Sequence, residues 1–145
     1  MSGRGDRIQL VLPTSAKYLQ TARLMASGLG ARAELGIPAV EDLKVAVSEA
    51  CTNACEHAFE TRDDEVEQPV MKLDFYVSDG EVTVEIEDEG QGFDPKHIPD
   101  TDDWEELKED AGLGLYLIRE LMDEVEIQSA PGSGTKIIMT KRASR

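Results

Sequence analysis

Two runs of alternating apolar and polar residues constrain the fold of this chain more than any other feature. They cover Val70 to Val77 and Glu81 to Glu87, and Ser78-Asp79-Gly80 separates them. Alternation with a period of two is typical of strands that bury one face, and an Asp-Gly pair favours a tight hairpin turn. The two runs therefore predict an antiparallel hairpin with one side against a core.

The segment from Ala39 to Phe59 has the other period, that of an amphipathic helix. Its apolar side chains recur at helical spacing and supply a buried stripe: Val40, Leu43, Val47, Ala50, Cys51, Ala54 and Ala58. Glu49, Asn53 and His57 follow one another one turn apart, so they form a separate polar stripe. A solvated helix face is the ordinary explanation of such a stripe. A carboxylate and a carboxamide one turn apart can also share one polar ligand.

The remaining predicted elements are shorter. Strands are expected at Ile8 to Leu12, Val125 to Gln128 and Lys136 to Thr140, and helices from a cap at Thr14 or Ser15 to Gly28 or Gly30 and over Gly112 to Met122. The order β-α-α-β-β-loop-α-β-β predicts an α+β fold. We expect a two-layer sandwich whose mixed, mostly antiparallel sheet carries helices on one face. The long acidic stretch from Asp94 to Asp110 is expected to be a functional or mobile loop.

Length and charge limit the class of protein. A chain of 145 residues suits one domain with a single core. Its 30 acidic and 15 basic residues give a formal charge of −15, so direct binding to nucleic acid or to an anionic membrane is not expected. No apolar run reaches the length of a membrane span, and Met1 to Arg7 lacks the apolar core of a signal peptide. We expect a soluble, cytoplasmic protein.

The two cysteines, Cys51 and Cys55, stand one turn apart on the long helix. As a metal pair they lack the further ligands of a closed zinc site, and a disulfide within one helix would be uncommon. We expect two reduced, buried or half-buried side chains.

Three glycine-containing segments could approach a phosphate. Asp88-Glu89-Gly90-Gln91-Gly92 leaves a strand without entering a helix, and the third glycine of a dinucleotide-binding fingerprint is missing. Gly132-Ser133-Gly134-Thr135-Lys136 lacks the Walker spacing and precedes a strand, so a tight hairpin turn explains it. Ala111-Gly112-Leu113-Gly114-Leu115 differs because it opens a helix. Free backbone N–H groups and the helix dipole favour an anion there.

Taken in order, four segments of the chain resemble the nucleotide-binding boxes of the GHKL ATPase superfamily: Glu49 to Ala54, Asp88 to Gly92, Gly112 to Leu115 and Gly132 to Thr135. The stretches EDLKVAVSEACTNACEHAF and GLGLYLIRELMDEVEI resemble the anti-sigma-factor serine kinases of the RsbW and SpoIIAB type. The resemblance runs from about Ile8 to Lys141. It implies a single kinase domain over residues 1–145 with the Bergerat (GHKL) ATP-binding fold, and a lid at about residues 94–111.

The resemblance also implies site residues. Glu49 would be the general base, and Asn53 would be a Mg²⁺ ligand that helps to hold ATP. Asp88 would accept a hydrogen bond from the adenine amino group, and Thr135 would help to hold the adenine. The other positions implied for ATP binding lie beside the base or the phosphates: Gly90, Gly92, Gly112, Leu113, Gly114 and Leu115. His57 matches a position that is commonly histidine in these kinases, and we assign it no chemical role.

The chain departs from the superfamily pattern in two places. Larger members often carry a further glycine where this chain has Asp110, and an acidic group there would repel phosphate unless it faces away or meets the metal. Some relatives place an arginine in the lid, whereas the nearby cations here are Lys96 and Lys108. Which cation meets the γ-phosphate is therefore open.

The function implied by the resemblance is that of an anti-sigma factor. Such a protein binds a sigma factor and phosphorylates an anti-anti-sigma protein of the STAS type on Ser or Thr, with ATP and Mg²⁺, and the family forms homodimers. One alternative is a non-catalytic anti-sigma binding module that responds to nucleotide. Another is the ATPase part of a histidine kinase, but the glutamate of the first box fits serine kinases better, and no segment resembles a helical phosphoacceptor domain.

Overall fold

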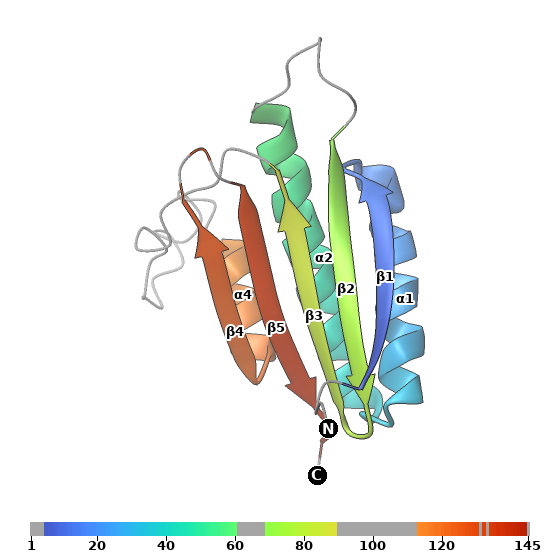
Figure 1. Cartoon of the computed structure of the whole chain (residues 1–145). Coiled ribbons are helices and arrows are strands. Elements are labelled where there is room, and N and C mark those ends of the chain that lie inside the picture. Colours follow the sequence, from blue (N-terminus) through green and yellow to red (C-terminus); the bar gives the residue numbers. More distant parts are fainter. Residues whose placement is uncertain (1–4, 61–68, 90–112, 131, 133, 145) are drawn as a thin grey trace.

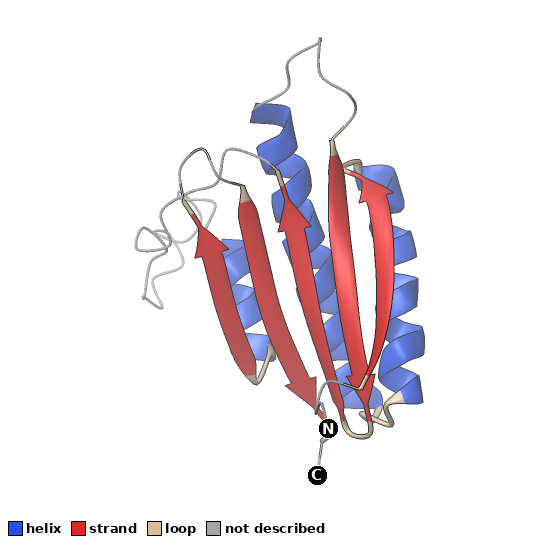
Figure 2. Cartoon of the chain, viewed as in Figure 1, coloured by secondary structure: helices blue, strands red, loops and turns tan. Residues whose placement is uncertain are grey.

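The computed structural model describes residues 5–60, 69–89, 113–130, 132 and 134–144, without the side chains of residues 57–60. In chain order the elements are β1 (Asp6–Pro13), the 3-10 helix η1 (Ala16–Tyr18), α1 (Leu19–Arg32), α2 (Ile37–Glu60), β2 (Val70–Ser78), β3 (Glu81–Asp88), α4 (Leu113–Leu121), β4 (Glu124–Ser129) and β5 (Thr135–Arg142). Figure 1 shows the strands side by side in one layer, with the helices behind them. Figure 2 shows the same two layers coloured by type. The predicted α+β sandwich is confirmed.

The strands form one sheet in the order β1-β2-β3-β5-β4, and every described pair is antiparallel. The predicted hairpin joins β2 to β3, where Ser78 pairs with Glu81 and Gly80 turns the chain with φ of +81°. Glycine adopts that backbone conformation without steric strain. The predicted alternation also holds, because the helix-facing residues of both strands are buried: Met71, Leu73, Phe75, Val77, Val82, Val84 and Ile86.

Strands β3 and β5 are neighbours in the sheet, although α4 and β4 lie between them in the chain. Their register pairs Asp88, the last residue of β3, with Thr135, the first residue of β5. The same residue of β5 pairs with Ser129, the last residue of β4. Three polar side chains from separate parts of the sequence therefore meet at one end of the sheet.

Helix α2 packs against both α1 and α4. Its buried side chains are mostly small and follow the predicted stripe: Ala39, Leu43, Ala46, Val47, Ala50, Cys51, Ala54 and Cys55. Small residues let neighbouring helices come close, and a Cβ added to Gly30 of α1 would lie 3.0 Å from Val40 Cγ2. Within the described residues, no helix is both long and apolar enough to cross a membrane.

The first helical stretch begins after Ser15, one of the two predicted cap residues, but its first turn is the 3-10 helix η1. Among the described residues the Ser15 side chain makes no capping hydrogen bond, and Tyr18 is the N-cap of α1. The Thr14 hydroxyl donates instead to the Pro69 carbonyl oxygen at 3.1 Å, just before β2. The Thr14 hydroxyl therefore bonds to a residue distant in the sequence and is not used to cap the helix. The helix also continues to Arg32, beyond the predicted glycines.

Both cysteines are free and buried, as the sequence predicted. Burial raises the pKa of Cys51 to about 12, with a smaller contribution from Cys55. The pKa of Cys55 is also raised, first by burial and then by the carboxylates of Glu56 and Asp88. Cys55 therefore lies near the point where α2 approaches the end of β3.

Lys141 of β5 connects the sheet to two helices. Its Nζ donates to the Leu121 carbonyl oxygen at 2.6 Å and lies 3.1 Å from Asp42 Oδ2 of α2. Leu121 ends α4, so the ammonium group satisfies a free carbonyl and complements the negative end of the helix dipole. This contact fixes the far end of α4 relative to α2.

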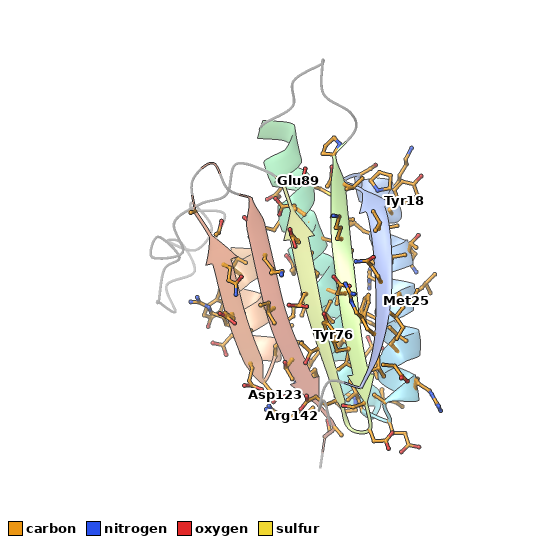
Figure 3. The ribbon with its side chains drawn as sticks, viewed as in Figure 1. Tyr18, Met25, Tyr76, Glu89, Asp123 and Arg142 are labelled. Carbon is orange, nitrogen blue, oxygen red and sulfur yellow. The ribbon has the colours of Figure 1, made fainter. Side chains whose placement is uncertain are left out.

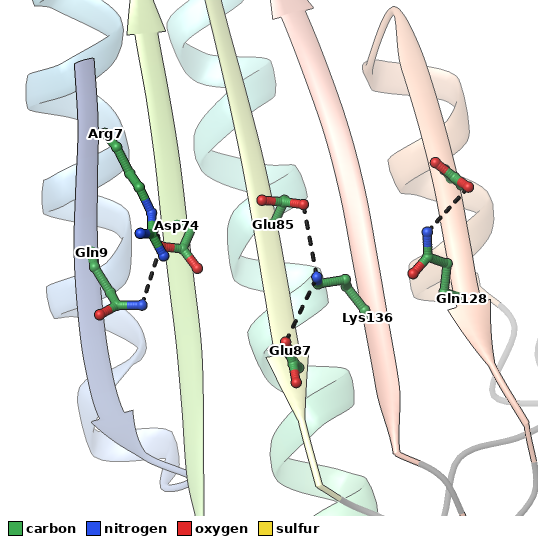
Figure 4. Close-up of polar contacts among 8 residues, drawn as sticks. Arg7, Gln9, Asp74, Glu85, Glu87, Gln128 and Lys136 are labelled. Atoms are coloured by element: carbon green, nitrogen blue, oxygen red, sulfur yellow. Dashed lines mark hydrogen bonds and ion pairs between the residues drawn. The ribbon is translucent and has the colours of Figure 1, made fainter. Parts of the chain in front are cut away.

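The face of the sheet opposite the helices carries polar side chains (Figure 3). Arg7 Nη2 lies 2.7 Å from Asp74 Oδ1, and Lys136 Nζ lies 3.9 Å from Glu85 Oε1 and 3.8 Å from Glu87 Oε2 (Figure 4). Ion pairs at the surface contribute little to stability, because water and salt screen them. The sheet therefore has one face in contact with solvent, and its ion pairs add little to the stability of the fold.

Candidate functional site

Glu49 and Asn53 lie on the side of α2 that faces the start of α4. Both side chains are half-buried. A Cβ added to Gly114, the second residue of α4, would lie only 2.9 Å from Glu49 Oε2. The carboxylate therefore rests against bare backbone, in a space that a side chain at residue 114 would occupy.

These residues line a pocket of about 230 Å³ between the two helices. Its lining residues are Glu49, Thr52, Asn53, Glu56, Leu113, Gly114 and Leu115. Two carboxylates lie on the α2 side, whereas the α4 side offers the first turn of a helix. N–H groups of a first turn have no acceptor within the helix, and the dipole there favours an anion. An anion in the pocket would thus be bound by the start of α4. Because the carboxylates would repel this anion, a cation would have to lie between them.

The amide nitrogen of Asn53 is buried and, among the described residues, has no hydrogen-bond partner. Leaving a buried donor unpaired costs about 1–3 kcal/mol, so such groups in native proteins usually have a reason. A half-turn of the carboxamide exchanges its nitrogen and oxygen. Asn53 can therefore donate to a phosphate oxygen or present an oxygen to Mg²⁺, which prefers oxygen ligands. The residues present fit a Mg²⁺-bound polyphosphate.

A second pocket, of about 520 Å³, opens where β3 and β4 end and β5 begins. Its lining residues are Glu87, Asp88, Gln128, Ser129, Ala130, Gly134, Thr135 and Lys136. Asp88 is 6% exposed and Thr135 is 3% exposed, and the two are partners in the sheet. A carboxylate oxygen accepts hydrogen bonds, so it suits an exocyclic amino group. This end of the sheet can therefore recognise an amino-bearing base.

The turn before β5 brings backbone close to Asp88. Gly134 has φ of +75°, and a Cβ there would collide with the Asp88 carbonyl oxygen. Ser129 Oγ donates to the Gly134 carbonyl oxygen at 3.0 Å and lies 2.9 Å from Thr135 Oγ1. Only a glycine fits this turn without displacing Asp88.

Sequence reasoning missed the contributions of Thr52, Glu56 and Ser129. Glu56 stands seven residues after Glu49, so helical spacing already puts the two on one face. Ser129 immediately precedes the predicted turn, and a hairpin places it opposite Thr135. Both signals were present in the sequence, although neither identifies a ligand without the neighbouring elements.

The structure brings Glu49 and Asn53 together with Leu113, Gly114 and Leu115, and it brings Asp88 to Thr135. Their chemical roles remain predictions. Several other predicted positions lie outside the described residues: Gly90, Gly92, Gly112, the lid at residues 94–111 with Lys96, Lys108 and Asp110, and the side chain of His57.

Comparisons with known proteins identify the class to which this fold and site belong. The histidine kinase-like ATPase domain matches residues 12–141. The chain belongs to this family. Within it, the serine-protein kinase RsbW of Bacillus pumilus (strain SAFR-032) is 36% identical over 146 residues, covering 97% of this chain and 88% of the relative. RsbW of Bacillus subtilis (strain 168) is 38% identical over 153 residues, covering 97% and 88%. The expected family and kinase class are thereby confirmed.

Solved structures share the fold. The RsbU and RsbW domains of a Mycobacterium tuberculosis protein superpose with a TM-score of 0.68 at 23% identity, over 97% of this chain and 32% of that chain. The histidine kinase domain of the Erythrobacter litoralis EL346 blue-light activated histidine kinase gives a TM-score of 0.53 at 24% identity, over 98% and 65%. At these identities the likeness supports the fold.

Proposed function

We propose that this protein is an anti-sigma factor that uses Mg-ATP to phosphorylate its own antagonist on serine or threonine. The observation that carries the proposal is the unpaired Asn53 amide beside Glu49 at the start of α4. The two pockets would hold opposite ends of one nucleotide. The base would meet Asp88 and Thr135, and the phosphates would lie near Asn53 and Gly114.

Glu49 is the proposed general base. In the transfer, the hydroxyl oxygen of the substrate bonds to the γ-phosphorus, the bond to the ADP oxygen breaks, and Glu49 accepts the hydroxyl proton. Asn53 would hold Mg²⁺, which neutralises phosphate charge when bound. Phosphoryl transfer depends mainly on positioning and charge neutralisation, so one carboxylate, one carboxamide and the start of a helix can suffice.

The proposed partners are proteins. The family resemblance implies a sigma factor and a STAS-type anti-anti-sigma protein, and the latter would be the phosphorylated substrate. A net charge of −15 suits basic protein partners rather than DNA, and complementary charge speeds association. Homodimer formation and a cytoplasmic location belong to the same proposal.

The test measures transfer of labelled γ-phosphate from ATP to the STAS-type antagonist. Glu49→Gln keeps the size of the side chain but removes the proton acceptor. We expect it to bind ATP as the wild type does and to transfer phosphate about 10²–10⁴-fold more slowly. Glu41→Gln is the matched control, because Glu41 lies on the same helix and, among the described residues, pairs locally with Lys44. It should transfer phosphate at the wild-type rate.

Transfer at the normal rate by Glu49→Gln would show that the base assignment is wrong. A different result would change the function itself. If the wild type bound ATP and the sigma factor but labelled no antagonist, the protein would be a non-catalytic module whose shape responds to nucleotide.

A further inference from the structure

Ser129, at the end of β4, contacts Gly134, which precedes β5, and Thr135, the first residue of β5. Its Oγ donates to the Gly134 carbonyl oxygen at 3.0 Å and lies 2.9 Å from Thr135 Oγ1. It also lines the larger pocket together with Asp88. The proposed phosphoryl transfer gives Ser129 no role, so its position needs a separate explanation.

The direction of the bond between the two hydroxyl groups follows from the number of hydrogens. A serine hydroxyl carries one hydrogen, and a carbonyl oxygen can only accept. Because Ser129 donates to Gly134, the hydrogen between Ser129 and Thr135 comes from Thr135. Thr135 Oγ1 therefore has only lone pairs to offer to a molecule in the pocket.

We infer that Ser129 is a positioning residue that makes the pocket select a purine with an amino group at position 6. The inference rests on the proposed nucleotide site. A carboxylate oxygen is also an acceptor, so Asp88 and Thr135 present acceptors on adjoining strands. Adenine offers an amino donor to them, whereas hypoxanthine and guanine offer a carbonyl oxygen. An oxygen at position 6 would bring its lone pairs against those of the two acceptors, so the site would reject an analogue that carries one.

The sheet holds these groups in place. Thr135 pairs in register with Asp88 on one side and with Ser129 on the other, and its side chain is almost fully buried. Backbone of Gly134 lies directly against the Asp88 carbonyl group. The Thr135 hydroxyl can still rotate about its own bond, and the contact with Ser129 fixes that rotation. Without Ser129, Thr135 could donate to an oxygen at position 6.

Binding of ATP and inosine triphosphate to the full chain measures the effect. Inosine triphosphate carries a carbonyl oxygen, with a hydrogen on N1, in place of the adenine amino group. The wild type should prefer ATP. The preference is measured as the Kd for inosine triphosphate divided by the Kd for ATP. Ser129→Ala should lower this Kd ratio about tenfold, which corresponds to roughly one hydrogen bond. Ser129→Thr keeps the hydroxyl and should keep the ratio.

Thr83→Val is the matched control. It removes another hydroxyl pair between neighbouring strands, in which Thr83 Oγ1 lies 2.9 Å from Thr140 Oγ1. This pair lies further along β3 and β5 and is not part of the pocket lining. Its Kd ratio should equal that of the wild type. An equal fall in Thr83→Val and Ser129→Ala would mean that general loosening of the sheet, rather than Ser129, sets the ratio, and would overturn the inference.

An unchanged ratio in Ser129→Ala, with ATP binding intact, would also overturn the inference and leave the proposed function standing. Failure of the wild type to bind either nucleotide would instead remove the proposed function, and the inference with it. If circular dichroism shows that Ser129→Ala does not fold, Ser129→Cys gives the same test. Its thiol is a weak donor, so the ratio should again fall below that of the wild type.

Discussion

At the scale of single residues, some side chains of the site are placed in ways that lower the stability of the fold. Asn53 buries an amide nitrogen that has no partner within the described chain. Glu49 places a carboxylate against the backbone of Gly114, beside the further carboxylate of Glu56. Local rules of packing and polar pairing are commonly broken at functional sites, where a ligand supplies what the fold leaves out. The site residues therefore have costs that a substitution can reveal.

Replacing Asn53 with leucine should raise stability and remove function. The substitution replaces an unpaired buried donor with an apolar side chain of similar size. We expect the free energy of unfolding in urea to rise by about 1 kcal/mol, and the affinity for Mg-ATP to fall at least about tenfold. A clear loss of stability would show that the amide has a structural partner and is not kept for a ligand.

Replacing Gly134 with alanine should damage the base pocket, and Gly132 offers a matched control. Both glycines have positive φ, +75° and +84°, so alanine strains the backbone by about 1 kcal/mol at either position. A Cβ at Gly134 meets the Asp88 carbonyl oxygen, whereas a Cβ at Gly132 meets no atom of the described residues within 4 Å. We expect ATP titrations to show lost affinity for Gly134→Ala alone. Equal losses in both variants would mean that turn strain, and not the position of Asp88, controls binding.

At the scale of elements, local periodicity determined what the sequence could predict. The observed bounds of β2, β3 and α2 lie within two residues of the expected ones, because each pattern is contained in one contiguous segment. The partner of the Thr14 hydroxyl could not be predicted, because its acceptor is the Pro69 carbonyl oxygen, 55 residues away. The meeting of Asp88 with Thr135 depends on sheet register, which no local pattern contains. The family resemblance, and not periodicity, placed those two residues in one site.

The contact of Lys141 with α4 joins residues far apart in the sequence, so no local pattern predicts it. Its contribution to stability can be tested by substitution. Lys141→Met removes the donor to the Leu121 carbonyl group and leaves Asp42 without its cation. We expect a loss of about 1–3 kcal/mol in the free energy of unfolding. The ATP affinity should also fall, because α4 carries Gly114 to Glu49.

The control for Lys141→Met is Lys44→Met, which removes the local pair that Lys44 makes with Glu41 on α2 within the described part of the chain. An exposed pair of this spacing contributes about 0.5 kcal/mol or less. Equal losses of stability in the two variants, measured by urea unfolding, would contradict the role of Lys141 in holding α4.

At the scale of the whole molecule, the two-layer architecture explains where the site forms. Helices cover one face of the sheet and polar side chains cover the other (Figures 2 and 3). Both pockets lie at the end of the sandwich where α4 and β5 begin and where β3 and β4 end. A nucleotide placed there can touch α2, α4 and the sheet together, which no single element could provide.

The central claim is that Glu49 and Asn53 divide one task, transfer and binding. It is tested most directly by measuring the Kd for Mg-ATP and the single-turnover rate of phosphate transfer on the same preparations of wild type, Glu49→Gln and Asn53→Leu. We expect Glu49→Gln to keep the wild-type Kd and lose the rate, and Asn53→Leu to lose affinity. If Glu49→Gln lost as much affinity as Asn53→Leu, or transferred phosphate at the wild-type rate, the division of roles would be contradicted.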